Sequence, residues 1–302
     1  MDDGLSQGSV DLGRLTGRIR AAFPDIAFTR AALIDDGEDH AVVVLDGAWV
    51  FRFPRTGERQ RLFNAELSLL EHIGTACEVQ VPRYAYVAPR SAFGGYAMIK
   101  GAALAPPVFA ALSRAAQERI LAQIAGLLRV VHSTSPKVVE TADGQIARQW
   151  SGADYALRYG EVTRASIEAS VSPGMLGAID RFYQDCGRRP RWPGEVVVHG
   201  DLTDDHLILA LDGQRLAGVI DFADAAVGDP AYDLAFFWAY GDWAAQFLAA
   251  AYEAADDGLL ERSRWAFARY SIDQICWAVL GHIPPDRAPE EEPLLRLLRS
   301  LC

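Results

Sequence analysis

Short apolar runs separated by turn residues dominate the first hundred residues of the chain. The dipeptide Asp46-Gly47 lies between two such runs, and this arrangement is a strong signal for a β-hairpin. An acidic loop at residues 35–40 precedes the hairpin and follows a further apolar triplet. The pattern predicts an antiparallel meander followed by more strands. The predicted strands are 26–28, 41–45, 49–53, 79–82, 84–87 and 96–101.

A different period, with apolar residues three and four positions apart, predicts helices. It covers residues 107–135 and 173–186, and it recurs in the aromatic-rich segment after residue 234. His132 ends the first of these segments, where a histidine favours the last turn of a helix over a ligand role. A further helix is predicted from Leu62, Leu67, Leu69, Leu70 and Ile73.

Three short apolar runs near residue 200 have polar side chains at their ends. Asp201 follows the first run, His206 directly precedes the second, and Asp221 directly follows the third. Asp201 stands five positions before His206 and twenty before Asp221. Single aspartates at strand ends are ordinary turn residues, but turn chemistry does not require both spacings together. The three runs are 195–198, 207–210 and 216–220.

Such a set suits phosphoryl transfer, which needs a carboxylate that orients a hydroxyl and ligands that hold Mg²⁺ beside the nucleotide phosphates. Asp201 is therefore predicted as the catalytic carboxylate, with Asp221 and His206 as the metal ligands. Because Mg²⁺ prefers oxygen ligands, His206 either binds the ion itself or orients a water.

Three motifs in the second half of the chain resemble the signature of the aminoglycoside phosphotransferase family, antibiotic-modifying enzymes similar to protein kinases. They are His-Gly-Asp at 199–201, Ile-Asp-Phe at 220–222 and Gly-Asp-Pro-Ala-Tyr-Asp-Leu-Ala at 228–235. The family usually has asparagine at the position of His206. A histidine there is similar to the aminoglycoside 2″-phosphotransferase and macrolide phosphotransferase branches.

The resemblance implies an α+β fold with the two lobes of a protein kinase. Residues 1–100 are expected to form a small, β-rich nucleotide-binding lobe, in which the polar stretch 1–11 is disordered. Residues 101–302 are expected to form a larger helical lobe for catalysis and substrate binding. The nucleotide would lie between the lobes.

Protein kinases grip the nucleotide phosphates with a third-strand lysine paired with a helix glutamate. The only lysines, Lys100 and Lys137, lie outside the first three predicted strands, so this role falls to Arg52. Arginine offers a planar, permanently charged fork for phosphate oxygens. Its predicted partner is Glu66, as in the 2″-phosphotransferases. Alternatively, Arg52 is an edge-strand charge and Glu66 a solvated helix residue.

The segment 96–101 resembles the family's hinge between the lobes. Backbone groups of Met98, Ile99 and Lys100 are predicted to hydrogen-bond the base, which leaves ATP and GTP both open as the phosphate donor. Gly101 is predicted to let the chain turn into the second lobe. The alternative is an edge strand that ends in a glycine turn.

The segment beyond residue 233 is rich in aromatic and acidic residues. An acidic pocket with aromatic walls would hold a polycation by charge and stacking, and the formal net charge of −11 agrees with this. A cationic antibiotic is therefore the predicted substrate. By resemblance, the predicted substrate contacts are Asp224, Asp242, Asp273 and Trp277.

Composition limits the remaining possibilities. A chain of 302 residues with 50% hydrophobic content can bury a large core. The four cysteines show no zinc or redox spacing, and there is no apolar N-terminal run, which predicts a cytoplasmic protein without a membrane span. The absence of basic runs argues against nucleic-acid binding. A monomer is expected.

Three functions follow from these residues. The favoured one is an ATP- or GTP-dependent, Mg²⁺-dependent kinase of an aminoglycoside, which confers resistance. The second is a kinase of a macrolide or a metabolite, for which an open apolar cleft would suit a macrolide. The third is a non-catalytic nucleotide-binding regulator, suggested by His206 and by the missing lysine.

Overall fold

The computed structural model describes residues 11–34, 39–141, 143–186, 188, 196–253 and 258–301. Most of the predicted acidic loop and nearly all of the predicted disordered N-terminal stretch therefore lie outside the described residues. The chain forms two compact units. The first comprises Met1–Ala147 with His199–Ala226, and the second comprises Arg148–Val198 with Val227–Cys302. The lobe boundary near residue 100 stays a prediction.

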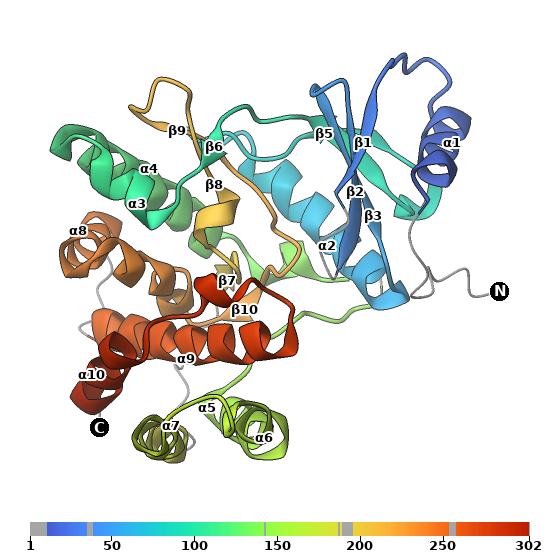
Figure 1. The fold of residues 1–302 in the computed structure, drawn as a ribbon. Coiled ribbons are helices and arrows are strands. Elements are labelled where there is room, and N and C mark those ends of the chain that lie inside the picture. The colour runs from blue at the N-terminus through green and yellow to red at the C-terminus, as the bar shows by residue number, and fades with distance from the viewer. Residues whose placement is uncertain are drawn as a thin grey trace. The chain divides into compact units, whose positions relative to one another are not determined.

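A five-stranded antiparallel sheet organises the N-terminal part of the first unit, in the order β1-β2-β3-β5-β4 (Figure 1). The β2–β3 hairpin turns at Asp46 and Gly47, both with positive φ (50° and 63°). Asp-Gly is suited to such a turn because both central residues need this conformation. The strands are β1 (Ala31–Ile34), β2 (His40–Leu45), β3 (Trp49–Pro54), β4 (Tyr84–Val87) and β5 (Gly94–Ala97).

Two helices cover the two faces of this sheet (Figure 1). α1 (Leu12–Ala22) packs Leu15 and Ile19 against Phe51 and Phe53 of β3. Because successive strand residues point to opposite faces, Arg52 faces away from α1. It faces α2 (Gly57–Ile73), which begins at the N-cap Thr56.

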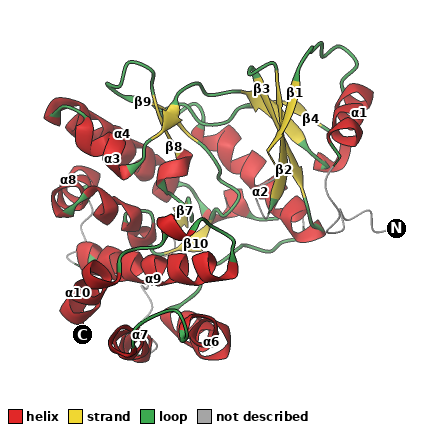
Figure 2. Cartoon of the chain, in the orientation of Figure 1, coloured by secondary structure: helices red, strands yellow, loops and turns green. Residues whose placement is uncertain are grey.

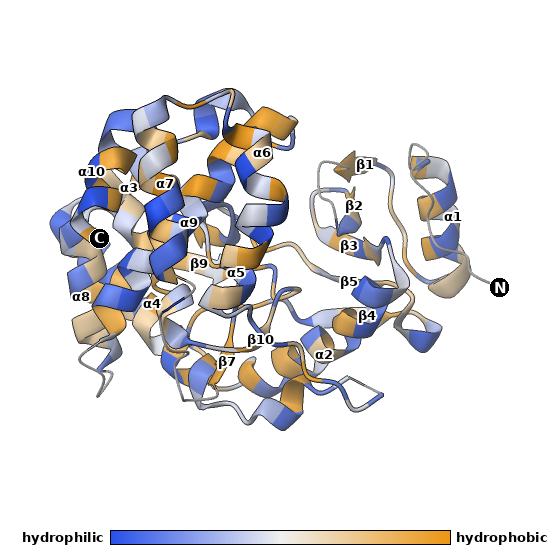
Figure 3. Cartoon of the chain, turned by 90° about the horizontal axis from the view of Figure 1, so that it is seen from below, coloured by the Kyte–Doolittle hydropathy of each residue, from blue (hydrophilic) through white to orange (hydrophobic). Residues whose placement is uncertain are grey.

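Four sequence expectations in this region were wrong. The first strand is β1 rather than 26–28, and α1 was not expected at all. Residues 79–82 form only a single bridge, Gln80 with Gly218, instead of a strand. β5 ends at Ala97, so 98–101 is not part of it. In Figure 3, hydrophobic and hydrophilic bands alternate along α1, which is the helical period that a search for strands overlooks.

The rest of the first unit consists of two helices and a three-stranded sheet of order β6-β8-β9. The predicted helical segment 107–135 forms both helices, and His132 is buried in the last turn of the second one. The β8–β9 hairpin matches the two apolar runs predicted there. The elements are α3 (Pro106–Ala111), α4 (Arg114–Ser133), β6 (Ala102–Ala103), β8 (Leu207–Leu209) and β9 (Leu216–Val219).

The second unit is mainly helical (Figure 2). Its core packs Phe182 of α7 onto Trp265 of α9, with ring centroids 4.4 Å apart. Its described strands, β7 (Val196–Val198) and β10 (Ala226–Gly228), pair with each other. The helices are α5 (Gly152–Arg158), α6 (Arg164–Ile167), α7 (Pro173–Cys186), α8 (Asp242–Tyr252), α9 (Leu259–Leu280) and α10 (Glu291–Leu301).

The predicted α+β class is confirmed, with a β-sheet in the N-terminal region and helices in the C-terminal part. Among the described residues, no helix is both long and apolar enough to cross a bilayer.

Candidate functional site

The loop that carries Asp201 begins directly after β7. Gly200 has a φ of 89°, and a Cβ at this position would collide with the backbone carbonyl of Asp224. Only glycine therefore allows the loop that presents Asp201 to approach the segment that follows Asp221 so closely.

His199 joins this loop to the end of β9. It is buried, and its Nε2 lies 3.0 Å from the carbonyl oxygen of Ile220. A carbonyl only accepts hydrogen bonds, so Nε2 carries the proton. Nδ1 then accepts the backbone N–H of Asp201 at 3.3 Å. One neutral imidazole thus fixes the position of Asp201 relative to the residue before Asp221.

His206 is fixed by a similar contact. Its Nδ1 lies 2.6 Å from the carbonyl oxygen of Asp201, so Nδ1 donates and the lone pair of the neutral ring is on Nε2. This Nε2 lies 3.7 Å from Oδ2 of Asp221. Burial lowers the pKa of His206, but the carboxylates of Asp201 and Asp221 outweigh it and raise the pKa above its usual value.

The guanidinium of Arg52, on β3 of the sheet, contacts the carboxylate of Asp221. Arg52 Nη2 donates to its Oδ1 at 2.6 Å. Burial raises the pKa of Asp221, but Arg52 and the neighbouring imidazoles hold it well below its usual range. Asp221 therefore stays ionised. Asp201, His206 and Asp221, which the sequence predicted to meet, lie together in the first unit.

The predicted partners Arg52 and Glu66 form a buried ion pair, with Nη1 and Oε1 2.5 Å apart. Neither is the exposed charge that the alternative interpretation required. Burial raises the pKa of Glu66 to about 7, although Arg52 opposes this rise. Arg52 Nη2 also lies 3.2 Å from Nδ1 of His40, whose pKa burial and Arg52 lower to about 3. His40 is therefore neutral.

The residues offer a partial fit to a divalent cation. Asp221 supplies a carboxylate oxygen, the ligand type that Mg²⁺ prefers, and the backbone contact of His206 leaves Nε2 turned toward it. A protonated His206 cannot act as a ligand. Within the part of the chain that the structure describes, no three acidic, histidine or cysteine side chains are grouped as a metal site.

The predicted hinge lies after β5. The N–H of Met98 donates to the carbonyl of Ala48 at 2.8 Å, so it is already used within the sheet. Ile99 and Lys100 have no backbone hydrogen bond to any described residue, so their backbone groups remain candidates for the base. Gly101 does not have a positive φ; a Cβ there would instead collide with the carbonyl of Leu209.

The predicted substrate residues are divided between the two units, with Asp224 in the first and the others in the second. Asp224 pairs with Arg59 of α2 at 2.9 Å. On α9, Asp273 pairs with Arg269 and shares a helix face with Trp277, which is 38% exposed. Asp242 lies at the start of α8, in a pocket lined by a different face of α9.

The Gly-Asp-Pro motif has a structural role in the second unit. Asp229 accepts the N–H of Ala231 and pairs with Arg262 of α9 at 2.6 Å. A Cβ on Gly228 would collide with Gln149, whose side chain accepts the N–H of Asp229. The motif thereby ties α9 to the chain that leaves β10.

Sequence reasoning missed Arg59 and His40. Arg59 bridges Asp39, at 2.7 Å, and Asp224. A cation in the first turn of a helix is unfavourable for the helix dipole, and this was a signal that Arg59 has acidic partners. His40 gave no comparable signal, because its contact with Arg52 depends on strand register.

Comparisons with known proteins identify a family and a common fold. The model of the phosphotransferase enzyme family matches residues 30–269. A GDP and kanamycin complex of APH(2″)-IIIa is 22% identical, with a TM-score of 0.78 over 95% of this chain and 98% of that chain. The streptomycin–ATP ternary complex of APH(2″)-IIa is 19% identical, with a TM-score of 0.66 over 89% and 91%.

A third structure extends the likeness to macrolide enzymes. The macrolide 2′-phosphotransferase MphH from Brachybacterium faecium is 20% identical, with a TM-score of 0.61 over 95% of this chain and 97% of that chain. At such identities the likeness shows a common fold. The family match, which covers most of the chain, shows more: the chain belongs to the phosphotransferase enzyme family.

Proposed function

We propose that this protein transfers the γ-phosphoryl group of ATP or GTP to a hydroxyl group of an antibiotic, with an aminoglycoside as the first candidate, and so confers resistance. The observation that carries the proposal is the linked set of Asp201, His206 and Asp221, fixed by His199 and joined to Arg52. The neighbouring structures contain kanamycin with GDP and streptomycin with ATP.

Asp201 accepts the proton of the substrate hydroxyl as its oxygen forms a bond to the γ-phosphorus. The bond from this phosphorus to the β–γ bridging oxygen breaks, and the nucleoside diphosphate leaves with that electron pair. Because the side chain of Asp201 is 44% exposed, a substrate can reach it. His199 orients its backbone, so the carboxylate needs little reorganisation.

Asp221 and His206 would hold Mg²⁺, which neutralises charge on the phosphate oxygens when it is bound. Arg52 has a second role available in addition to its pairing with Asp221. Its fixed guanidinium places positive charge beside this carboxylate, where it would steady the phosphates. Met98, Ile99 and Lys100 would contact the base through backbone groups.

A specific observation favours a less cationic substrate as the second candidate. Asp224 and Asp273, two of the three acidic residues predicted to attract a polycation, already have arginine partners. Paired carboxylates attract a polycation less strongly than free ones. A macrolide or a hydroxylated metabolite would need fewer negative charges, and a macrolide phosphotransferase is among the neighbouring structures.

The test is nucleotide turnover with ATP and with GTP, in the presence of aminoglycosides, macrolides or no acceptor. We expect acceptor-dependent release of nucleoside diphosphate and a product that is heavier by one phosphate. Cells that express the protein should then tolerate the same antibiotic. Bound nucleotide without turnover on any acceptor would favour the non-catalytic regulator instead.

Asp201→Asn separates chemistry from binding. It removes the proton acceptor but keeps the backbone contacts with His199 and His206. We expect kcat to fall by about a thousandfold, within the range of general-base contributions, with nucleotide affinity nearly unchanged. Steady-state kinetics and nucleotide titration measure the two effects. Retained turnover would contradict the role of Asp201.

A further inference from the structure

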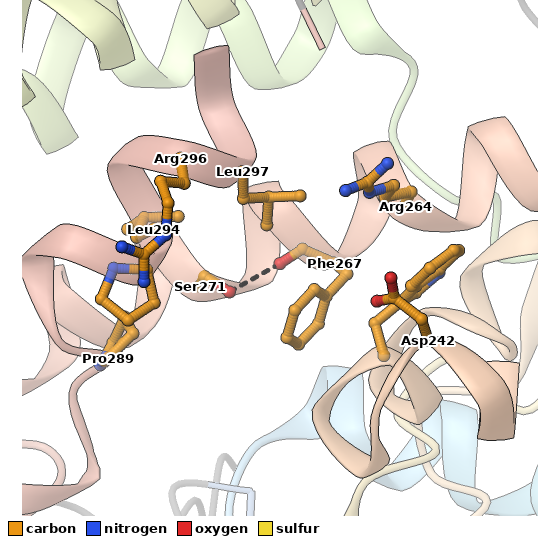
Figure 4. A pocket seen from close by; sticks show the side chains of 10 residues that line it. Asp242, Arg264, Phe267, Ser271, Pro289, Leu294, Arg296 and Leu297 are labelled. Atoms are coloured by element: carbon orange, nitrogen blue, oxygen red, sulfur yellow. Dashed lines mark hydrogen bonds between the residues drawn. The ribbon is translucent and has the colours of Figure 1, made fainter. Parts of the chain in front are cut away.

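A pocket of about 300 Å³ lies in the second unit among α8, α9 and α10 (Figure 4). Its size is at the lower end of small-molecule sites, and most of its lining is apolar with a few polar groups, as in such sites. The lining residues are Trp238, Asp242, Arg264, Phe267, Ser271, Pro289, Pro293, Leu294, Arg296 and Leu297.

The pocket and the predicted substrate residues use different faces of α9. Arg264, Phe267 and Ser271 are three and four positions apart, so they form one stripe along the helix. At about 100° per residue, Asp273 and Trp277 lie roughly 110° to 150° around the helix from this stripe. The pocket is therefore separate from the face of α9 that carries Asp273 and Trp277, and Asp242 is the one predicted substrate contact that lines it.

Two opposite charges line this pocket, and neither has an ion-pair partner among the described residues. Arg264 forms no ion pair or hydrogen bond with any described residue, and its Nε is buried and unsatisfied. Its guanidinium lies over the ring of Trp238, 5.4 Å from the centroid. Asp242 likewise has no ion pair within the described chain, and it does not pair with Arg264 although both line the pocket.

The other polar groups of the pocket are already used. The hydroxyl of Ser271 donates to the carbonyl of Phe267 (Figure 4), and the indole N–H of Trp238 donates to Ser263. Arg296 pairs with Glu292 at 3.2 Å, on the exposed side of α10. Buried polar groups are normally satisfied, so the buried Nε of Arg264 is the group that a ligand would complete. Asp242 is exposed to solvent and offers a carboxylate at the pocket that has no ion pair among the described residues.

We propose that this pocket binds a hydrophobic α-amino acid. The carboxylate of the ligand accepts hydrogen bonds from Arg264, its ammonium group donates to Asp242, and its side chain packs among Phe267, Leu294 and Leu297. A simple carboxylate would make no use of Asp242, and a simple amine would leave the buried Nε of Arg264 unsatisfied. The proposal reassigns Asp242 from the phosphate acceptor to this second ligand.

Calorimetric titration of the full-length protein with three related probes tests the proposal. L-Phenylalanine carries both charges, 3-phenylpropanoate lacks the ammonium group, and 2-phenylethylamine lacks the carboxylate. We expect saturable binding of L-phenylalanine and at least about tenfold weaker binding of the other two, because each loses one charge-assisted hydrogen bond. No binding of L-phenylalanine, or equal binding of one truncated probe, would overturn the proposal.

Two variants assign the charges. Arg264→Gln and Asp242→Asn should each weaken L-phenylalanine binding by about tenfold or more. Arg299→Gln on α10 and Asp286→Asn, both at exposed positions outside the pocket, should not. Thermal unfolding shows whether each variant is folded, and Arg264→Lys replaces Arg264→Gln if the latter is not. Unchanged affinity in a folded Asp242→Asn protein contradicts the assignment.

A competition measurement distinguishes this site from an acceptor site. A saturating aminoglycoside should leave the affinity for L-phenylalanine unchanged, because the acceptor face of α9 lies elsewhere. If the aminoglycoside and L-phenylalanine displaced each other, both would bind at Asp242. The pocket would then belong to the phosphate acceptor, and the proposal would be wrong.

Discussion

Asp221 has a left-handed backbone conformation, with a φ of 64°. Few residues other than glycine adopt it, although aspartate does so more readily than most, and such positions are often found at functional sites. The conformation directs the carboxylate back toward Arg52 and His206 instead of continuing the direction of β9. Sequence spacing predicted that Asp221 would meet Asp201, but it did not predict this turn.

Asp221→Ala tests the metal role of this residue. Without the carboxylate, we expect nucleotide affinity in Mg²⁺ to fall about tenfold or more, since the ion would lose a charged oxygen ligand. Titration with a fluorescent nucleotide, with Mg²⁺ and with EDTA, measures this. Asp221→Asn, which tolerates the same backbone conformation, separates charge from strain. Equal affinity in all three proteins would exclude the metal role.

The Arg52–Glu66 pair has an effect on stability that does not require nucleotide. Removing one partner of a buried pair leaves an uncompensated charge, so Glu66→Gln should lower the free energy of unfolding by about 3 kcal/mol. Glu71→Gln, on the exposed face of the same helix, should change it by less than about 0.5 kcal/mol. Urea denaturation of both variants compares them. Equal stabilities would mean that the pair contributes nothing net.

Residue-level prediction succeeded where the order of chemical groups along the chain is informative. The arginine on the third strand and the glutamate on the next helix follow a known order, and the two residues are in contact. His40 and Arg59 contact Arg52 and Asp224 through strand register and helix phase. Neither of these two contacts can be predicted from the spacing of residues along the sequence.

At the scale of elements, the turn of the β2–β3 hairpin also holds a neighbouring segment of the chain in place. Asp46, in its turn, accepts the backbone N–H groups of Arg30, at 2.7 Å, and Thr29. The turn therefore fixes the chain just before β1. These hydrogen bonds, with Arg30 first, lower the pKa of Asp46 below its usual value.

This shift gives a pH-dependent contribution to stability. Because the folded pKa lies below the unfolded one, the contribution is present above the unfolded pKa and is lost as the pH falls through the folded pKa. Asp46→Asn should therefore lower the Tm at pH 7, and the difference from wild type should disappear by about pH 2. Thermal unfolding across this range tests it. A difference that persists at the acidic end would contradict the carboxylate's role.

Errors in the predicted elements have two physical causes. The triplet 26–28 is apolar enough to form a strand, but the edge position was taken by β1, which pairs with β2 from Ala31 to Ile34. This tertiary pairing is not encoded in local pattern. α1 was overlooked although Leu12, Leu15 and Ile19 have the helical spacing of three and four, because these apolar residues are few.

At the scale of the whole molecule, net charge and local charge give different expectations. The chain carries a formal charge of −11, which attracts polycations at a distance. At short range, Asp224 and Asp273 are paired with arginines. Affinity for a cationic acceptor would then depend mainly on the long-range field.

Salt dependence measures this balance. If the acceptor is an aminoglycoside, its KM should rise about tenfold between about 0.05 and about 0.5 M NaCl, because salt screens exposed charges. The KM of a macrolide, with little charge, should change by less than about twofold over the same range. A salt-independent KM for an active aminoglycoside would show that paired, local contacts dominate instead.

The division into two compact units was not predictable from the sequence. Residues 199–226, which carry Asp201, His206 and Asp221, are compact with the N-terminal part of the chain although the segment between belongs to the second unit. The amino-acid composition does not change where the chain enters this segment, at residue 199, or where it leaves it, at residue 226. Contacts between residues far apart in sequence bring these segments together, among them the pairing of β6 with β8, the Gln80–Gly218 bridge and the Arg52–Asp221 ion pair.

The scarcity of lysine has a practical consequence. Only two of the 29 lysine and arginine residues are lysines, and the position beside Asp221 is held by Arg52. Nucleotide reagents that label kinases acylate an amine near the phosphates, and a guanidinium at Arg52 does not undergo this reaction under the same conditions. A survey of kinases by such labelling would pass over this protein even while it hydrolysed or transferred phosphate.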